Sequence, residues 1–170
     1  MDFFHLRKIF TAAIYFIIPT LILSEPGLDW FVSYNGTGEE SMGHFIIECE
    51  DGGFLQVGET YFFTEPTTTK LYVVKTDMDG EKIWDKEINI GGHNLGNSVI
   101  EAVDGYIIFG ALNENSSIIK LSKSDGSIIF NKNYDYGGTD AFENGVIVSG
   151  GIAAVGLSLI HISEPTRQSL

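Results

Sequence analysis

The sequence predicts an all-β protein, and three features carry this prediction. The 170-residue chain contains 20 Gly but 4 Pro, and aromatic residues make up 12% of it, a mixture that favours strands joined by glycine turns. Short apolar runs at residues 71–75, 98–103 and 117–121 are typical of strands. Asp-Gly and Gly-Gly dipeptides separate these runs and supply the positive φ angles that two-residue hairpins require, so the runs and turns together form the second feature. The third feature is an internal repeat.

Three landmarks recur in the same order along the chain. The first is a strand that carries an aromatic residue and leads to a small polar turn. The second is a Gly-containing hairpin between two apolar strands, and the third is an acidic-Gly turn before the next aromatic residue. The aromatic anchors are Trp30, Trp84 and Phe130, the closing glycines of the hairpins are Gly58, Gly110 and Gly156, and the acidic turns end at Gly80 and Gly126.

Each repeat holds four predicted antiparallel strands in roughly 40 to 50 residues, which is the size of one β-propeller blade. In a propeller each blade packs one face on the next blade. We therefore expect residues 25–156 to form an incomplete propeller of about two to three blades. The residues expected at contacts between blades are Trp30, Trp84, Phe130, Gly58, Gly110 and Gly156.

A family resemblance strengthens this prediction. Residues 76–84 read Thr-Asp-Met-Asp-Gly-Glu-Lys-Ile-Trp and resemble the docking motif of quinoprotein-type propeller repeats, in which the Trp packs between blades. The resemblance covers residues from about 28 to 156, although Phe130 replaces the Trp in one copy and the copy at 27–30 is one residue short. The pattern Trp-x-Lys-x-x-x-x-Gly-Gly followed by Asp-Gly-Tyr is more similar to repeats of uncharacterised secreted microbial propellers. The resemblance thus implies a fold rather than an activity.

The N-terminal segment has the layout of a signal peptide. Arg7 and Lys8 precede an apolar run at residues 9–23, and Ser24 supplies a small residue for cleavage. We expect a signal helix over residues 1–24 and a secreted, cell-surface or periplasmic protein. The alternative is an uncleaved membrane anchor, although the run is short for a span and Pro19 interrupts it.

The C-terminal segment has a different origin in our interpretation. Residues 157–167 match, residue by residue, the translation of a transposon-based sequencing-library adapter. We therefore expect natural sequence to stop at about Gly156 and residues 157–170 to be an artefact. His161, Glu164 and Arg167 would then carry no function. The alternative is an ordinary strand at 157–162 followed by a Ser-Glu-Pro turn.

Composition and motif spacing exclude several kinds of site. The net charge of −13 repels phosphate backbones, so nucleic acid is not an expected partner. Cys49 is the only cysteine, which rules out an intrachain disulfide, and its strand-like surroundings indicate a small buried residue. The histidines are too isolated for a zinc motif, and the Asp77-x-Asp79-Gly80 segment favours a hairpin turn over a calcium loop. We expect no metal, no cofactor and no catalytic residue.

Asn35 and Asn115 match the N-glycosylation pattern, which has meaning only in a eukaryotic host. Both positions fall at predicted turns.

The sequence favours a binding or scaffold module over an enzyme. Loops at one end of a rigid propeller commonly bind a protein, a glycan or a small ligand. The alternatives are the N-terminal part of a quinoprotein oxidoreductase or hydrolase whose catalytic blades are missing, and a structural component of an envelope assembly complex. Contact with a membrane is expected only through the N-terminal segment, if it stays uncleaved.

Overall fold

The computed structural model describes residues 31–38, 40–61 and 68–159. The predicted signal segment, Trp30 and the residues after Leu159 lie outside the described part of the chain. From Val32 onward the chain forms one compact unit. Its ten strands are β1 (Ser41–Glu48), β2 (Phe54–Thr60), β3 (Lys70–Thr76), β4 (Lys82–Ile88), β5 (Leu95–Ala102), β6 (Gly105–Leu112), β7 (Asn115–Leu121), β8 (Ile128–Tyr134), β9 (Thr139–Val148) and β10 (Gly151–Leu159).

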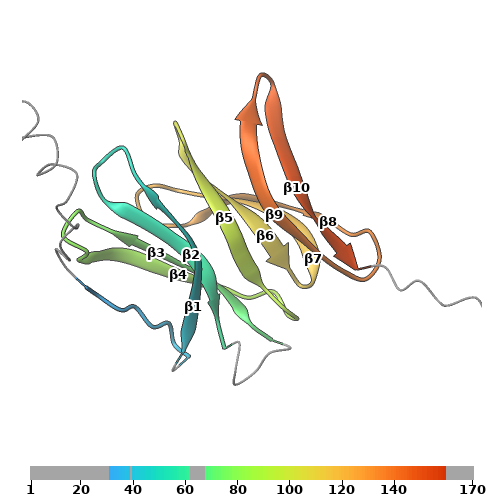
Figure 1. The fold of residues 1–170 in the computed structure, drawn as a ribbon, viewed down its shortest axis with the longest axis horizontal. Coiled ribbons are helices and arrows are strands. Elements are labelled where there is room, and N and C mark those ends of the chain that lie inside the picture. The colour runs from blue at the N-terminus through green and yellow to red at the C-terminus, as the bar shows by residue number, and fades with distance from the viewer. Residues whose placement is uncertain (1–30, 39, 62–67, 160–170) are drawn as a thin grey trace, which may run out of the picture. The chain divides into compact units, whose positions relative to one another are not determined.

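The strands form two four-stranded antiparallel sheets and one hairpin (Figure 1). The first sheet has the order β1-β2-β3-β4, the second has the order β5-β6-β7-β8, and β9 pairs with β10. Within each sheet and in the hairpin, strands that follow one another in sequence pair antiparallel, as hairpin connections do. The predictions of an all-β fold and of four antiparallel strands per sheet are confirmed. No helix in the described residues is long and apolar enough to cross a membrane.

The two sheets and the hairpin share an irregularity at equivalent positions. The pairing of the first two strands shifts between Gly43 and Phe45 in the first sheet, and between Gly96 and Ser98 in the second. The partners of Gly43 and Gly96 are Gly58 and Gly110. A Cβ atom on Gly58 or Gly110 would lie 1.9 Å or 2.1 Å from a carbonyl oxygen of the adjacent strand, so a side chain does not fit.

The same arrangement recurs in the hairpin. Pairing shifts between Val155 and Gly156, and a Cβ atom on Gly156 would lie 2.1 Å from the carbonyl oxygen of Ala141. The predicted closing glycines Gly58, Gly110 and Gly156 thus lie where adjacent strands approach closely. Their contacts are with the neighbouring strand of their own sheet.

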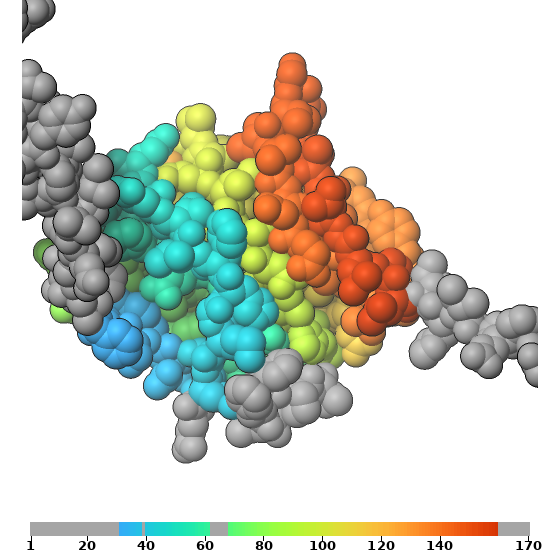
Figure 2. Space-filling view, in the orientation of Figure 1, coloured from blue at the N-terminus to red at the C-terminus, as the bar shows by residue number. Residues whose placement is uncertain are grey.

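The sheets stack face to face through one apolar core. In Figure 2, β1 and β2 (cyan), β5 (yellow) and the β9–β10 hairpin (orange to red) follow one another across the visible face. Strand β5 contacts β1, β2 and β3 of the first sheet, and β9 contacts β5, β6 and β7 of the second. The core between the sheets contains Cys49, Leu55, Val57, Leu71, Val73, Ile88, Val99, Tyr106, Ile108, Leu112, Ile119 and Leu121. We call this contact between the two four-stranded sheets the inter-sheet seam.

A second, smaller core joins the second sheet to the hairpin. Ile107, Phe109 and Ile118 are buried there, and Phe142 and Ala154 of the hairpin pack against them. Gly145 lies against Phe109 so closely that a Cβ atom would come within 2.2 Å of its ring. Strand β10 continues to Leu159, so residues 157–159 pair with β9. The pairing does not test where the codons for residues 157–159 come from, so their adapter origin stays a prediction.

Candidate functional site

Trp84 joins the two sheets across the inter-sheet seam. Its Nε1–H donates a hydrogen bond of 3.1 Å to the carbonyl oxygen of Lys123, in the turn between β7 and β8. The indole also lies against Gly126 of that turn, where a Cβ atom would come within 2.7 Å of the ring. The Tyr106 ring, on β6, is 6.3 Å from the indole. The residue predicted as a blade anchor therefore contacts the sheet that follows it.

Phe130 occupies the corresponding place on β8 but is 41% exposed. Its neighbours Ile128 and Ile129 are about half exposed, at 49% and 52%. The difference from Trp84 is that the hairpin supplies only two strands to the second sheet's outer face, whereas four strands cover the first sheet. Trp30, the first predicted anchor, lies outside the described residues.

Three strand connections meet at one end of the sheets, which we call the loop end. The connections are those between β2 and β3, between β4 and β5, and between β6 and β7. Asn94 links them: its Nδ2 donates to the carbonyl oxygens of Thr69 (2.8 Å) and Gly92 (3.0 Å), and its Oδ1 accepts from the Asn113 amide (3.0 Å). Because Asn94 is fully buried, these bonds fix Thr69, Gly92 and Asn113 relative to one another.

Backbone conformations that side chains rarely adopt gather at the loop end. Within the described residues, the positive φ angles outside glycine belong to Tyr61 (70°), Asn113 (50°) and Glu114 (65°). Such residues persist only where their surroundings hold them, and they are common at binding and catalytic sites. Asn113 and Glu114 are the two central residues of the β6–β7 hairpin, whose tight turn requires positive φ at both positions.

A buried carboxylate at the loop end lies between two histidines. Glu59, on β2, is 3% exposed. His44 Nε2 is 3.5 Å from its Oε1 atom, and His93 Nε2 is 3.1 Å from its Oε2 atom. The histidines approach from different elements, since His44 lies in β1 and His93 in the β4–β5 connection. Both imidazoles are about one-quarter exposed, which gives the buried carboxylate a polar path to the surface.

The Glu59 cluster, formed by His44, Glu59 and His93, places a buried carboxylate between two imidazoles. Oε2 of Glu59 has no partner in hydrogen-bond geometry, although His93 Nε2 lies 3.1 Å from it. Within the described part of the chain, no group of three His, Cys, Asp or Glu side chains is arranged to hold a metal ion. No sequence motif points to this cluster, because its members are far apart in the sequence.

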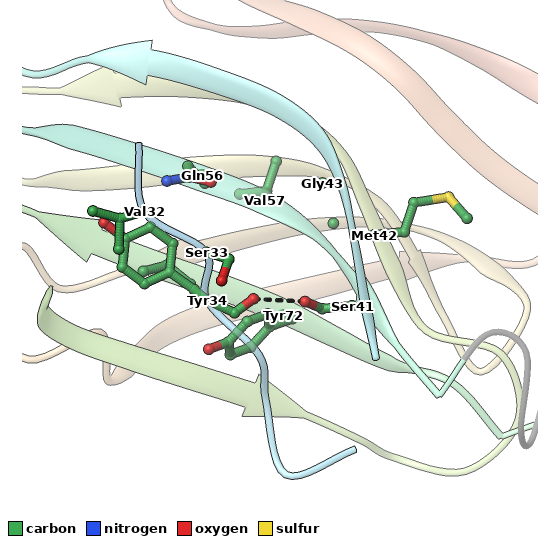
Figure 3. A pocket seen from close by; sticks show the side chains of 11 residues that line it. Val32, Ser33, Tyr34, Ser41, Met42, Gly43, Gln56, Val57 and Tyr72 are labelled. Atoms are coloured by element: carbon green, nitrogen blue, oxygen red, sulfur yellow. Dashed lines mark hydrogen bonds between the residues drawn. The ribbon is translucent and has the colours of Figure 1, made fainter. Parts of the chain in front are cut away.

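A short N-terminal segment covers part of the face of the first sheet that points away from the second sheet (Figure 3). The Oγ–H of Ser41 donates to the carbonyl oxygen of Tyr34 over 2.7 Å, and the Tyr34 hydroxyl donates to the carbonyl oxygen of Gly80. A hollow of about 170 Å³ lies between this segment and β1 to β3. It is lined by Val32, Ser33, Tyr34, Ser41, Met42, Gly43, Gln56, Val57, Gly58, Tyr72 and Val74.

Glu87 anchors the next residues of this segment. Thr37 donates to the Glu87 carboxylate from both its backbone amide and its hydroxyl, and Lys70 Nζ lies 2.7 Å from Glu87 Oε2. Burial of the Glu87 carboxylate acts to raise its pKa, but the hydrogen bonds from Lys70 and Thr37 outweigh burial and lower it below the ordinary value. Glu87 is therefore a charged attachment point for residues 36–38.

Two other candidates from the sequence have structural roles. Cys49 is buried in the inter-sheet core, as predicted, and burial raises the pKa of its thiol despite a hydrogen bond with Tyr106 and the charge of Lys75. A raised pKa is the opposite of what a nucleophilic cysteine needs. In the acidic turn, Asp77 Oδ1 accepts from the amides of Asp79 (2.9 Å) and Glu81 (2.8 Å), as a hairpin turn does.

Asn35 lies in the irregular N-terminal segment and Asn115 is the first residue of β7. Asn115 Nδ2 donates to the carbonyl oxygen of Asn113 over 3.2 Å. No protein-family model, curated protein or solved structure matches this chain.

Proposed function

We propose that this protein is an exported β-propeller that binds its ligand or partner through the loop end. The observation that carries the proposal is the repeated stacking of like sheets. The second sheet has the same strand order and the same paired-glycine irregularity as the first sheet it packs against, and the β9–β10 hairpin packs on the second sheet with a pairing shift of its own. Stacking of this kind is how propeller blades pack.

The loop end supports a binding role. The Asn94 hydrogen bonds join Thr69, Gly92 and Asn113, one residue from each of three connections, and the Glu59 cluster lies beside them. A rigid scaffold that displays loops is a common basis for binding proteins, glycans or small molecules. The apolar run before Ser24 supports export to the surface, the periplasm or the medium.

An independent read of the uninterrupted gene tests the proposal. We expect codons 157–167 to be replaced by sequence that continues the third sheet, with another acidic-Gly turn and another aromatic anchor. Additional blades without a catalytic constellation support a binding module. A carboxylate or cofactor constellation in those blades would instead support the enzyme, and an envelope-assembly domain the structural component. A genomic read that retains the adapter-like codons would contradict the predicted artefact.

A further inference from the structure

The first sheet carries a buried carboxylate at a place where the second sheet carries an alanine. Glu59 directly follows Gly58, and Ala111 directly follows Gly110, at matched places on β2 and β6. Because side chains alternate along a strand, Glu59 lies on the same face of β2 as Val57, which is part of the core at the inter-sheet seam. The Glu59 carboxylate therefore lies where this core reaches the loop end, and it is 3% exposed.

The pairing shifts of the two sheets differ in the same way. His44 is the extra residue in the shift of the first sheet, and Asn97 is the extra residue in the shift of the second. Asn97 Nδ2 donates a hydrogen bond of 3.0 Å to the carbonyl oxygen of Phe142, so this contact joins two neutral groups. His44 Nε2 instead lies 3.5 Å from a carboxylate oxygen of Glu59. Titratable groups in the first sheet thus stand where the second sheet has neutral ones.

His93 connects the carboxylate to the turns of the loop end. Its Nε2 lies 3.1 Å from Oε2 of Glu59, and its carbonyl oxygen accepts a hydrogen bond of 3.0 Å from the amide of Glu114. The carbonyl oxygen of Glu114 accepts a hydrogen bond of 2.8 Å from the amide of Asp140, on β9. A continuous chain of contacts therefore runs from the first sheet through the β4–β5 connection to the hairpin.

The charges around the Glu59 cluster favour a bound proton. On the adjoining elements at the loop end, the charged side chains of the described residues are Glu40 before β1, Lys70 on β3, Glu87 on β4, Glu114 in the β6–β7 turn and Asp140 on β9. Lys70 Nζ lies 2.7 Å from Oε2 of Glu87, so these two charges pair with each other. The others are acidic, and nearby negative charge favours the protonated form of a titratable group.

We propose that the Glu59 cluster is a pH-sensitive contact, which holds the β4–β5 connection against the first sheet more tightly as the pH falls from about 8 toward 6. In an unfolded chain above the ordinary histidine pKa of about 6.5, imidazoles are neutral and glutamates are ionised. The same protonation state in the folded chain leaves a buried negative charge uncompensated, which is strongly unfavourable. The folded cluster therefore takes up a proton, which pairs the charge if an imidazole carries it and removes the charge if the carboxylate does. The inference does not depend on the number of blades or on the ligand of the loop end.

The extra proton sets the direction of the pH effect. Because the folded chain binds more protons than the unfolded chain, the stabilisation is fully present at about pH 6 and is lost as the pH rises and the cluster gives up its proton. Urea denaturation of the full chain at several pH values measures the effect. We expect the unfolding equilibrium constant to rise several-fold, and at most about tenfold, per pH unit between about pH 6.5 and 8.

Variants assign this dependence to the cluster. Glu59→Gln and the double variant His44→Gln, His93→Gln should each remove most of the pH dependence, whatever they do to stability at a single pH. The side chain of Glu101 is 12% exposed and pairs with Lys123 over 2.7 Å, so Glu101→Gln is the matched control and should keep the dependence. All variants retain the other two of the four histidines. A pH dependence that survives in both cluster variants would overturn the proposal.

NMR of the unaltered chain locates the proton without any substitution. At about pH 7.5 we expect either an imidazolium nitrogen signal from His44 or His93, or the carbon signal of a protonated carboxyl group from Glu59. Neutral imidazoles together with an ionised Glu59 at that pH would contradict the proposal, even if the variants failed to fold.

Discussion

At the scale of single residues, the least expected feature is the Glu59 carboxylate. It is almost fully buried, and the imidazoles of His44 and His93 lie within 3.5 Å and 3.1 Å of its oxygens. A buried charge that loses its partners is strongly destabilising, whereas a neutral group of the same shape is tolerated. The cluster therefore links the stability of the loop end to two surface-reachable histidines.

Replacing both histidines should expose this dependence. We expect the double variant His44→Ala, His93→Ala to lower the free energy of unfolding by about 3 kcal/mol, because the Glu59 charge stays buried without a partner. Adding Glu59→Gln to the double variant should recover much of that loss. Urea unfolding at pH 7 measures both effects. A triple variant as unstable as the double variant would show that the charge is not the cause.

Gly110 and Gly43 both lie at pairing shifts, but substitutions at the two positions should have different effects. A Cβ atom on Gly110 would lie 2.1 Å from the carbonyl oxygen of Leu95, which cannot move without breaking the sheet. Gly110→Ala should therefore lower the free energy of unfolding by about 2 kcal/mol or more. Gly43→Ala, at the partner position in the first sheet, should change it little. Thermal unfolding of the two variants checks the difference, and equal effects would contradict the assigned register.

The sequence singled out Gly58, Gly110 and Gly156 as contacts between blades, whereas each lies against the neighbouring strand of its own sheet or hairpin. The carboxylate cluster escaped notice for a physical reason. Glu59 has no equivalent charged residue in the second sheet, where Ala111 follows Gly110. A feature that occurs in one repeat leaves no periodic signal, so only the fold brings its members together.

At the scale of elements, Trp84 and Phe130 occupy equivalent strands but different surroundings. Trp84 contacts the β7–β8 turn and packs against the inter-sheet core, so Trp84→Ala should lower the free energy of unfolding by about 3 to 5 kcal/mol. Phe130→Ala should cost less than about 1 kcal/mol in this chain, because the ring is 41% exposed. Chemical denaturation of both variants tests the contrast. A large loss from Phe130→Ala would show that another element covers β8.

The attachment of the N-terminal segment should depend on pH. Hydrogen bonds from Lys70 and Thr37 lower the Glu87 pKa in the folded chain, so this carboxylate stabilises the attachment above its unfolded pKa of about 4.3. The stabilisation should be lost as pH falls through the lower folded pKa. The protection factor of the Thr37 amide, its observed exchange rate corrected for the intrinsic rate at each pH and followed by NMR, should fall over that range, and Glu87→Gln should lower it at pH 7. Glu48→Gln is the control, and equal loss of protection in both variants would contradict the role of Glu87.

The strands themselves were predictable because local pattern and turn chemistry agree. Apolar runs at 71–75 and 117–121 became β3 and β7, and the Asp-Gly turns lie between strands as expected. The order of strands followed from short connections, which leave sequential antiparallel pairing as the simple solution. The arrangement of the loop end was not predictable, because Asn94 and the loops it links show no periodicity.

At the scale of the whole molecule, the two four-stranded sheets are stacked parts of a single core rather than independent units. The buried side chains of both sheets belong to one cluster, which spans the inter-sheet seam. Neither sheet alone would cover its apolar face, because each relies on the other to exclude water. The proposed propeller and the role of Trp84 both follow from this shared core.

Native-state hydrogen exchange tests this claim most directly. Amides of β2 and β3 in the first sheet and of β6 and β7 in the second should exchange with the same opening free energy, because they open together. Trp84→Ala should lower the opening free energy of both pairs of strands by the same amount, since its side chain bridges the seam. Distinct opening free energies for the two sheets, or a Trp84→Ala effect confined to β2 and β3, would contradict the shared core.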